Sequence, residues 1–175
     1  MLDFFNELKK KRTDAKFLLI TKDDPKSILN KVKEKTIDTN AIIIKPSSRE
    51  MMPSYIGCSN FSIFFILPVF SKKASSPTKM GEIMNLGIPI ICNDGVGDVE
   101  EIMNDCMPEL LIKEFSEKEY QRVISLILND YQVDSKKIIN TSHQYYSLEK
   151  GVEKYASVYK SILNINHDDT SPLSK

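Results

Sequence analysis

The sequence is poor in several features that would point to a particular class of protein. Its 175 residues include three cysteines, Cys58, Cys92 and Cys106, an odd number with no C-x-x-C pair. This spacing excludes a disulfide framework and a zinc ribbon, and it favours a reducing cytoplasm. We expect the three thiols to serve packing.

An excess of charge of either sign is also missing. Lys and Arg together number 24, as do Asp and Glu, so the formal net charge at pH 7 is zero. A chain without a basic excess lacks the broad positive field of a non-specific nucleic-acid binder. We therefore expect no nucleic acid among its partners.

Long apolar runs are missing as well. No stretch is long enough to cross a bilayer, and the first residues, Met1 to Glu7, carry an acid where a secretory signal needs a basic region. The hydrophobic fraction of 41% and the charged fraction of 27% are those of an ordinary globular protein. We expect a folded cytoplasmic chain, with any membrane role limited to peripheral association at the inner face.

Two kinds of apolar segment alternate along the chain. Short continuous runs such as 17–21 are typical of strands buried on both faces of a parallel sheet. Segments with apolar residues every three or four positions, such as 120–128, are typical of helices. The expected strands are 17–21, 41–45, 61–67, 88–92 and 110–112, and the expected helices are 2–12, 25–35, 49–57, 76–87, one starting at Asp98, 116–128, 135–144 and 148–163.

Capping residues mark several of these helix ends. Ser76-Pro77 supplies a favoured N-cap followed by a proline suited to the first helical position, and Gly87 is a typical terminator. Residues 116–119 match a capping box, with Phe115 and Tyr120 spaced for a hydrophobic staple. These signals predict two well-defined helices.

Alternating strands and helices imply βαβ units with right-handed crossovers. The expected fold class is therefore α/β: a Rossmann-like, doubly wound parallel sheet with helices on both faces. We expect one domain over residues 1–163 and a disordered polar tail over 164–175. Ligands of such sheets bind outside the carboxyl ends of the strands, which directs attention to the loops after strands 17–21, 41–45, 61–67 and 88–92.

The loop after Leu67 carries the most informative chemistry. It places hydroxyls, small residues and lysines directly before a helix N-terminus, where an anion such as phosphate is stabilised. Lys79 and Glu82 share one side of that helix, and a carboxylate so placed can accept hydrogen bonds from ribose hydroxyls. The spacing alone is equally compatible with a simple helix cap and a weak surface ion pair worth about 0.3 kcal/mol.

A longer pattern separates these interpretations. Residues 75–91 resemble the S-x-P-x-K-x-x-E segment, with its following G-x-P-V-I, of the group 1 glycosyltransferases. The likeness extends through 93–102 and through 146–159, and it covers nearly all of residues 1–163. It implies the C-terminal, nucleotide-sugar-binding Rossmann domain of a retaining enzyme with the two-domain GT-B architecture.

The resemblance implies roles for particular residues. Glu82 would bind the nucleotide ribose. Arg49 would lie in the loop that faces the base, but it could equally be a residue in the first turn of a helix, exposed to solvent. Ala74 departs from the family, many of whose members have an acid near the donor sugar at this position. The implied sets are Ser75, Ser76, Thr78 and Lys79 for the diphosphate, Lys45, Ser47 and Arg49 for the base, and Ser71, Lys72, Lys73, Gly95 and Gly97 for the donor sugar.

Other candidate sites are less well supported. Gly95 and Gly97 begin a G-x-G-x-x-G pattern, but its third glycine would fall on Glu100, which argues against a dinucleotide site. His143 has no second ligand at metal spacing and is expected to be structural, and His167 falls in the tail. We expect no metal and no cofactor apart from the nucleotide sugar substrate, and no catalytic residue is assigned.

Two parts of the family architecture have no counterpart in the sequence. One is the N-terminal domain that holds a glycan or lipid-linked acceptor, and the other is the first, central strand of the donor domain. Loss of that strand would leave the two strands beside it with unpaired backbone N–H and C=O groups. We expect Phe17 to Thr21 either to pair directly with Phe61 to Leu67 or to borrow a strand.

The expected function is that of a donor-binding domain of a retaining glycosyltransferase in polysaccharide or glycan biosynthesis. One alternative is a non-catalytic nucleotide-binding remnant or subunit that needs a partner chain. The other is a nucleotide-sugar epimerase, which fits less well because such enzymes need acid/base groups and the sequence has no cluster of histidines or carboxylates to supply them.

Overall fold

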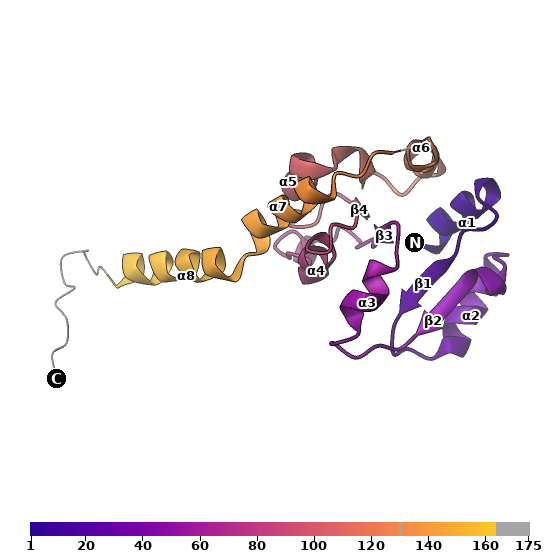
Figure 1. Cartoon of the computed structure of the whole chain (residues 1–175), viewed down its shortest axis with the longest axis horizontal. Helices are drawn as coiled ribbons and strands as arrows, with labels where there is room; N and C mark the ends of the chain where they lie inside the picture. The colour runs from indigo at the N-terminus through magenta and orange to yellow at the C-terminus, as the bar shows by residue number, and fades with distance from the viewer. Residues whose placement is uncertain (130, 164–175) are drawn as a thin grey trace.

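A computed structural model describes residues 1–129 and 131–163 (Figure 1). The chain has the expected α/β fold, in which parallel strands are flanked by helices. Its elements are α1 (Leu2–Lys11), β1 (Phe17–Ile20), α2 (Pro25–Glu34), η1 (Thr39–Ala41), β2 (Ile42–Lys45), α3 (Met52–Gly57), β3 (Ser62–Ile63), η2 (Phe70–Lys72), α4 (Thr78–Met84), β4 (Ile90–Asn93), α5 (Val99–Cys106), η3 (Pro108–Leu110), β5 (Leu111–Ile112), α6 (Glu117–Leu128), α7 (Ser135–Tyr146) and α8 (Leu148–Ile162).

The strands form two separate parallel sheets. One has the order β1-β2, with Phe17 opposite Ile42, and the other has the order β3-β4-β5, with Ser62 opposite Ile90. Figure 1 shows α1 and α2 on one side of the strands and α3 and α4 on the other. The direct pairing of segment 17–21 with segment 61–67, one of the two expected alternatives, is wrong, because β1 and β3 belong to different sheets.

Helix α1 joins two hydrophobic cores. Phe4 packs edge-on against Phe65 and Tyr120 in the larger core, which surrounds β3, β4 and β5. Phe5 stacks on Phe17, with ring centroids 5.1 Å apart, in the smaller core under β1 and β2. Both rings are almost fully buried, so α1 holds the two sheets against each other through adjacent residues.

Strand β3 is shorter than predicted, but its partner continues the pairing with a side chain. The N–H of Phe64 donates to the carbonyl of Ile91. Beyond it, the Asn93 amide donates to the Ile66 carbonyl and accepts from the Ile66 N–H, each at 2.8 Å. A buried side chain thus replaces main chain at the end of the strand, which the apolar run 61–67 could not indicate.

The other boundaries differ by a few residues. Strand β2 starts after a 3-10 turn, in which the Asp38 side chain accepts from the N–H of Asn40. Helix α3 starts at Met52 rather than Arg49, because residues 49–51 form a turn. Differences of this size arise where a cap or turn competes with the regular element.

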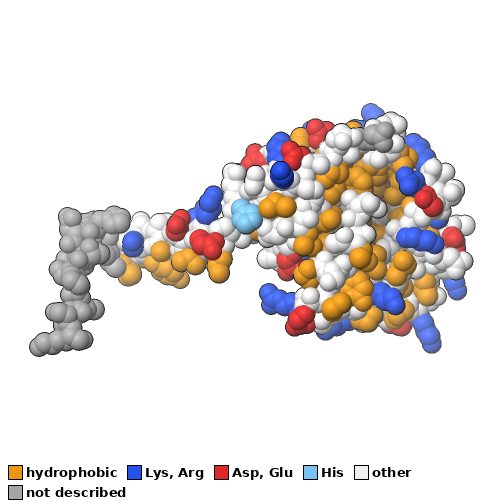
Figure 2. Space-filling view, in the orientation of Figure 1, with side chains coloured by type: hydrophobic (Ala, Val, Ile, Leu, Met, Phe, Trp, Pro, Cys, Tyr) orange, Lys and Arg blue, Asp and Glu red, His pale blue; other side chains and the backbone are white. Residues whose placement is uncertain are grey.

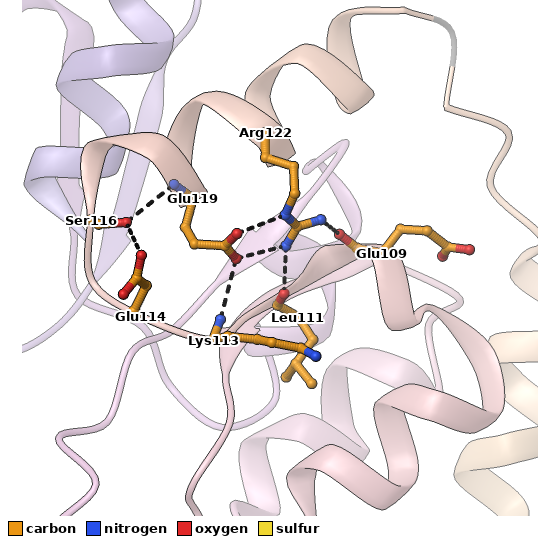
Figure 3. A network of polar contacts seen from close by, with 7 residues as sticks. All are labelled: Glu109, Leu111, Lys113, Glu114, Ser116, Glu119 and Arg122. Atoms are coloured by element: carbon orange, nitrogen blue, oxygen red, sulfur yellow. Dashed lines mark hydrogen bonds and ion pairs between the residues drawn. The ribbon is translucent and has the colours of Figure 1, made fainter.

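Half of the predicted capping box at α6 is present (Figure 3). The Ser116 hydroxyl accepts from the N–H of Glu119 at 3.3 Å, as predicted. The Glu119 carboxylate turns away to the Arg122 guanidinium and to the N–H of Lys113. The staple is indirect, since the ring of Phe65 lies between those of Phe115 and Tyr120.

Arg122 ties α6 to the edge of the larger sheet (Figure 3). Its guanidinium donates to the carbonyls of Glu109 and Leu111, each at 2.7 Å, while it pairs with Glu119. The Arg122 hydrogen bond is the main cause that lowers the pKa of the Glu119 carboxyl. Two carbonyls beside the last strand are therefore satisfied by one side chain.

Helix α8 extends away from the domain (Figure 1) and none of its residues is buried. Its apolar side chains recur on one side of the helix and form the orange lower edge in Figure 2. They include Leu148, Val152, Tyr155, Tyr159 and Ile162. Within residues 1–129 and 131–163, no helix has the length and apolar character to span a membrane. The predicted polar tail, 164–175, lies outside the described residues.

Candidate functional site

The loops after β3 and β4 meet at the carboxyl edge of the larger sheet. The N–H of Gly97 donates to the carbonyl of Lys72 at 3.1 Å. The hydroxyl of Ser76 lies 3.1 Å from a carboxylate oxygen of Asp98. These contacts bring the loop expected to hold the diphosphate against the glycine loop expected to face the donor sugar.

Both glycines of the second loop adopt the left-handed conformation, with φ of +73° at Gly95 and +47° at Gly97. A Cβ on Gly97 would collide with the carbonyl oxygen of Ser75, and one on Gly95 would lie 3.0 Å from the Pro68 side chain. The glycines therefore permit two backbone segments to touch, which is a different task from cradling a dinucleotide.

One predicted cap is wrong at this edge, and the helix start expected at Asp98 is correct but lacks a side-chain bond. Helix α4 begins at Thr78 with Pro77, not Ser76, at the N-cap, and no side chain caps it. Asp98 is the N-cap residue of α5, but its carboxylate does not bond to the helix. The two side chains bond to each other instead, so the interaction between loops replaces both local caps. Helix α4 also ends earlier than predicted, at Met84 with Asn85 as its C-cap, and Gly87 has φ of +68° in the turn that follows.

Helix α4 is held by its buried side against α7. A Cβ on Gly81 would lie 2.7 Å from the ring of Tyr146, and the Ser142 hydroxyl donates to the Gly81 carbonyl at 3.3 Å. The buried side comprises Met80, Gly81, Ile83 and Met84. Lys79 and Glu82 consequently lie on the solvent side of the same helix.

Lys79 and Glu82 form an ion pair at 3.0 Å. The two side chains are 62% and 46% exposed, so the pair contributes at most about 1 kcal/mol to folding. Their charges are therefore accessible to a ligand, and replacing either one leaves the fold's main supports in place.

An open cleft of about 700 Å³ lies between α3 and α4. It brings Arg49, from the segment after β2, to the same site as Lys79 and Glu82. Its polar lining is completed by Asn85, and its apolar lining is Met52, Pro53, Ile56 and Leu86. Of the predicted site residues, the cleft unites one from the base-facing set, one from the diphosphate set and the ribose residue.

The remaining predicted residues do not line this cleft. Lys45 ends β2, and Ser47 donates to the carbonyl of Ser48. Ser71 and Lys72 lie on the exposed turn η2, and Lys73 follows it. Ser75 and Ser76 lie between that turn and α4, which begins at Thr78, and Ser75 donates to the Ser71 carbonyl at 3.5 Å. The residues of loop 71–78 that were predicted to bind the sugar and the diphosphate thus directly precede or begin α4, the helix that lines the cleft.

A comparison with protein families identifies the family of the chain. The sequence profile described as Glycosyl transferases group 1 matches residues 1–144. The chain belongs to this family. A comparison with curated proteins finds no significant match. The match includes β1 to β5 and the whole of the cleft between α3 and α4.

Three residues, Asn93, Tyr146 and Asp98, hold segments around the cleft through contacts that were not predicted from the sequence. Asn93 fixes the end of β3, where the loop towards α4 begins. Tyr146 packs on Gly81, and burial, opposed by the nearby Ser76 hydroxyl, raises its pKa to about 12. One buried oxygen of Asp98 and the Tyr146 hydroxyl lack a hydrogen-bond partner within the described part of the chain. The residues that Asn93, Tyr146 and Asp98 contact are distant in sequence, so no local motif marks these contacts.

Among the described residues, His143 and the three cysteines do not form a metal site. Across residues 1–129 and 131–163, no group of three His, Cys, Asp or Glu side chains could hold a metal ion. His143 is exposed on α7, contrary to a role in the core. Cys92 is fully buried, and burial raises its pKa to about 12, as expected of a packing residue. Cys58, however, is exposed.

Proposed function

We propose that this glycosyltransferase domain binds a nucleotide diphosphate sugar in the cleft between α3 and α4. The parent enzyme would transfer the sugar with retention of configuration during polysaccharide or glycan synthesis. A glycan or lipid-linked acceptor would be held by a further domain or a partner chain. No cofactor or metal is needed by the groups assigned to the donor.

The observation that carries the proposal is the meeting of Arg49, Lys79 and Glu82 around one cleft. Lys79 supplies a cation for the diphosphate, Arg49 supplies a planar guanidinium that can stack on a base, and a carboxylate is the acceptor that paired ribose hydroxyls require. The apolar wall of Met52 and Pro53 beside Arg49 suits the flat face of a base. Charge, hydrogen bonding and shape therefore favour a nucleotide over an uncharged ligand.

The same residues suit the chemistry of transfer. Negative charge develops on the diphosphate as its bond to the sugar breaks, and a nearby cation stabilises that charge. Lys79 is the group placed to do so, with Glu82 holding its ammonium at 3.0 Å. The loop 71–77, packed against Gly97, would lie beside the sugar.

Calorimetric titration of the purified chain with UDP, GDP, ADP and CMP, and with their sugar derivatives, tests the proposal. We expect one nucleotide diphosphate to bind. Glu82→Ala and Lys79→Ala should each weaken its binding by about tenfold, or ~1.4 kcal/mol. Both side chains are exposed, so thermal unfolding should be nearly unchanged.

Matched controls are Glu34→Ala and Lys33→Ala, which remove one charge of each sign outside the cleft lining. They should leave the affinity within about twofold. Failure of every nucleotide to bind the folded chain would contradict the proposal. Equal losses in the control and cleft variants would show a response to net charge instead of a site. Retention is checked separately, from the anomer of the first sugar product by NMR.

A further inference from the structure

The two sheets face each other across a second cleft, and we propose that this cleft accepts an extended apolar strand from another polypeptide segment, inserted parallel to β1 and β3. The cleft has a volume of about 700 Å³. It is lined by residues of both strands, among them Leu18, Ile20, Ser62 and Ile63. An inserted strand would join β1-β2 and β3-β4-β5 into one continuous sheet.

The backbone of β1 offers a free edge to the cleft. The N–H of Thr21 donates to the carbonyl of Lys45. The backbone N–H and C=O groups of Thr21 and Leu19 therefore point towards β2. Successive residues of a parallel strand direct these groups to opposite edges. Leu18 and Ile20 therefore direct their N–H and C=O groups away from β2.

The backbone of β3 offers the matching edge. Ser62 donates to the carbonyl of Pro89, and Phe64 donates to that of Ile91, so both direct their polar groups towards β4. By the same alternation, Ile63 and Phe65 direct theirs away from β4. Backbone N–H and C=O groups thus line both sides of the cleft. A strand inserted there would hydrogen-bond to them with its own C=O and N–H groups.

The burial of side chains differs between β4, which is paired on both edges, and the strands β1 and β3, which border the cleft. All four residues of β4, which has a neighbour on each side, are buried. None of the residues of β1 or β3 is buried, although these strands would be central in a single sheet. Figure 2 shows apolar side chains gathered over the region between these strands.

The walls of the cleft define the chemistry of the occupant. Leu8 of α1 and Ile127 of α6 line it from helices that pack together, and Ile56 lines it from α3, which lies across the strands from α1. A strand placed between them is apolar on both faces, as in the interior of a parallel sheet. Residues 164–175 contain no run of four apolar residues, so this tail does not supply the strand.

The direction of the strand follows from the edges. Residues 14–16 precede β1 and residues 58–60 precede β3, and both segments line the cleft. The amino ends of the two strands therefore lie at the same end of the cleft. A parallel strand would have its own amino end there, next to Cys58, whose thiol is exposed.

Hydrogen exchange of the full chain with and without the peptide acetyl-Lys-Val-Ile-Val-Ile-Val-Lys-amide tests the insertion. We expect exchange in residues 17–21 and 61–66 to slow by about tenfold or more at saturation, with a concentration-dependent rise in Tm. The control peptide has the same side chains but N-methylated central amides, and it should do neither. Leu18→Pro removes a donor from the free edge alone, so this variant should fold and lose the response.

The thiol of Cys58 reports the direction. A peptide cysteine activated as a mixed disulfide with thionitrobenzoate exchanges with the Cys58 thiolate, forming a new S–S bond and releasing thionitrobenzoate as the leaving thiolate. Placed at the peptide's amino end, this cysteine should react about tenfold faster than at the carboxyl end. Cys58→Ser is the control and should abolish the difference.

A strand fused genetically ahead of Met1, through a short glycine linker, provides a second measurement, since the N-terminus lies beside β1 and β3 in Figure 1. Unchanged exchange with both the peptide and the fusion would overturn the proposal. Protection of the same amides in a dimer of the chain alone would overturn it in favour of a second copy. Faster reaction at the carboxyl end would overturn the parallel direction. None of these outcomes depends on nucleotide binding.

Discussion

Phe4 and Phe5 are consecutive in the sequence, yet their rings lie in different hydrophobic cores. Phe4 belongs to the core around β3, β4 and β5, and Phe5 belongs to the core under β1 and β2. Because adjacent helical residues differ by about 100° in direction, one helix can occupy both cores at once. Helix α1 is thereby the main apolar connection between the two sheets.

This division predicts that the two positions destabilise different regions. Phe5→Leu should raise the hydrogen-exchange rate in residues 17–20 and 42–45, with little change in 90–93. Phe4→Leu should instead raise the exchange rate in residues 90–93. Each substitution should cost about 1 kcal/mol, which is small enough for the chain to stay folded. Hydrogen exchange followed by mass spectrometry gives the comparison, and identical patterns for both variants would show a single cooperative core.

The contact between Gly97 and Ser75 predicts a large effect of a single methyl group. Gly97→Ala would introduce a Cβ against the Ser75 carbonyl at a positive φ, so we expect a loss of at least about 2 kcal/mol in stability. Gly57→Ala is the control, because a Cβ there meets nothing within 4 Å. That variant should be neutral or stabilised by up to about 1 kcal/mol. Urea unfolding measures both, and similar losses would contradict the close approach of the loops.

The Arg122–Glu119 pair predicts a particular dependence of stability on pH. The pKa of Glu119 is lowered in the folded state, so its contribution is fully present above the ordinary value of 4.5. It is lost as pH falls through the lower, folded-state pKa. The difference in unfolding free energy between the wild type and Glu119→Gln should therefore be largest near neutral pH and shrink below pH 4.5. A difference that grows on acidification would contradict the sign.

The order and type of the elements could be predicted because each leaves a local trace. The continuous apolar run of Phe17 to Ile20 and the period of Tyr120, Val123 and Ile124 are set by burial against neighbours, and they are visible in the sequence. The Ser116 cap is equally local. The α/β fold was therefore predictable before any contact was known.

What could not be predicted depends on contacts between distant segments. Ser76 has every local mark of an N-cap, but Asp98 competes for its hydroxyl across 22 positions. Asn93 resembles an ordinary strand end, although its amide pairs with Ile66, 27 positions away. Among the base-facing residues, nothing local distinguishes Arg49, which lines the cleft, from Lys45, which does not. Only the packing of α3 against α4 separates them.

That separation yields the sharpest test of the donor cleft. If Arg49 stacks on the base, Arg49→Ala should weaken nucleotide binding by about tenfold, whereas Lys45→Ala, which removes the same charge outside the cleft lining, should change it by less than about twofold. Arg49→Lys should recover only part of the affinity, because an ammonium keeps the charge but lacks the planar group.

The same variants separate stacking from simple attraction to phosphate. Inorganic pyrophosphate carries the charge of the diphosphate without a base, so Arg49→Ala should leave its affinity nearly unchanged if the guanidinium contacts the base. Lys79→Ala should weaken pyrophosphate and the whole nucleotide alike, because Lys79 would act on the diphosphate. An equal loss of pyrophosphate binding in the Arg49 and Lys79 variants would indicate that Arg49 contacts the phosphates instead of the base. Titration at two salt concentrations would then show that the affinity depends more steeply on salt, as expected of a contact between charges.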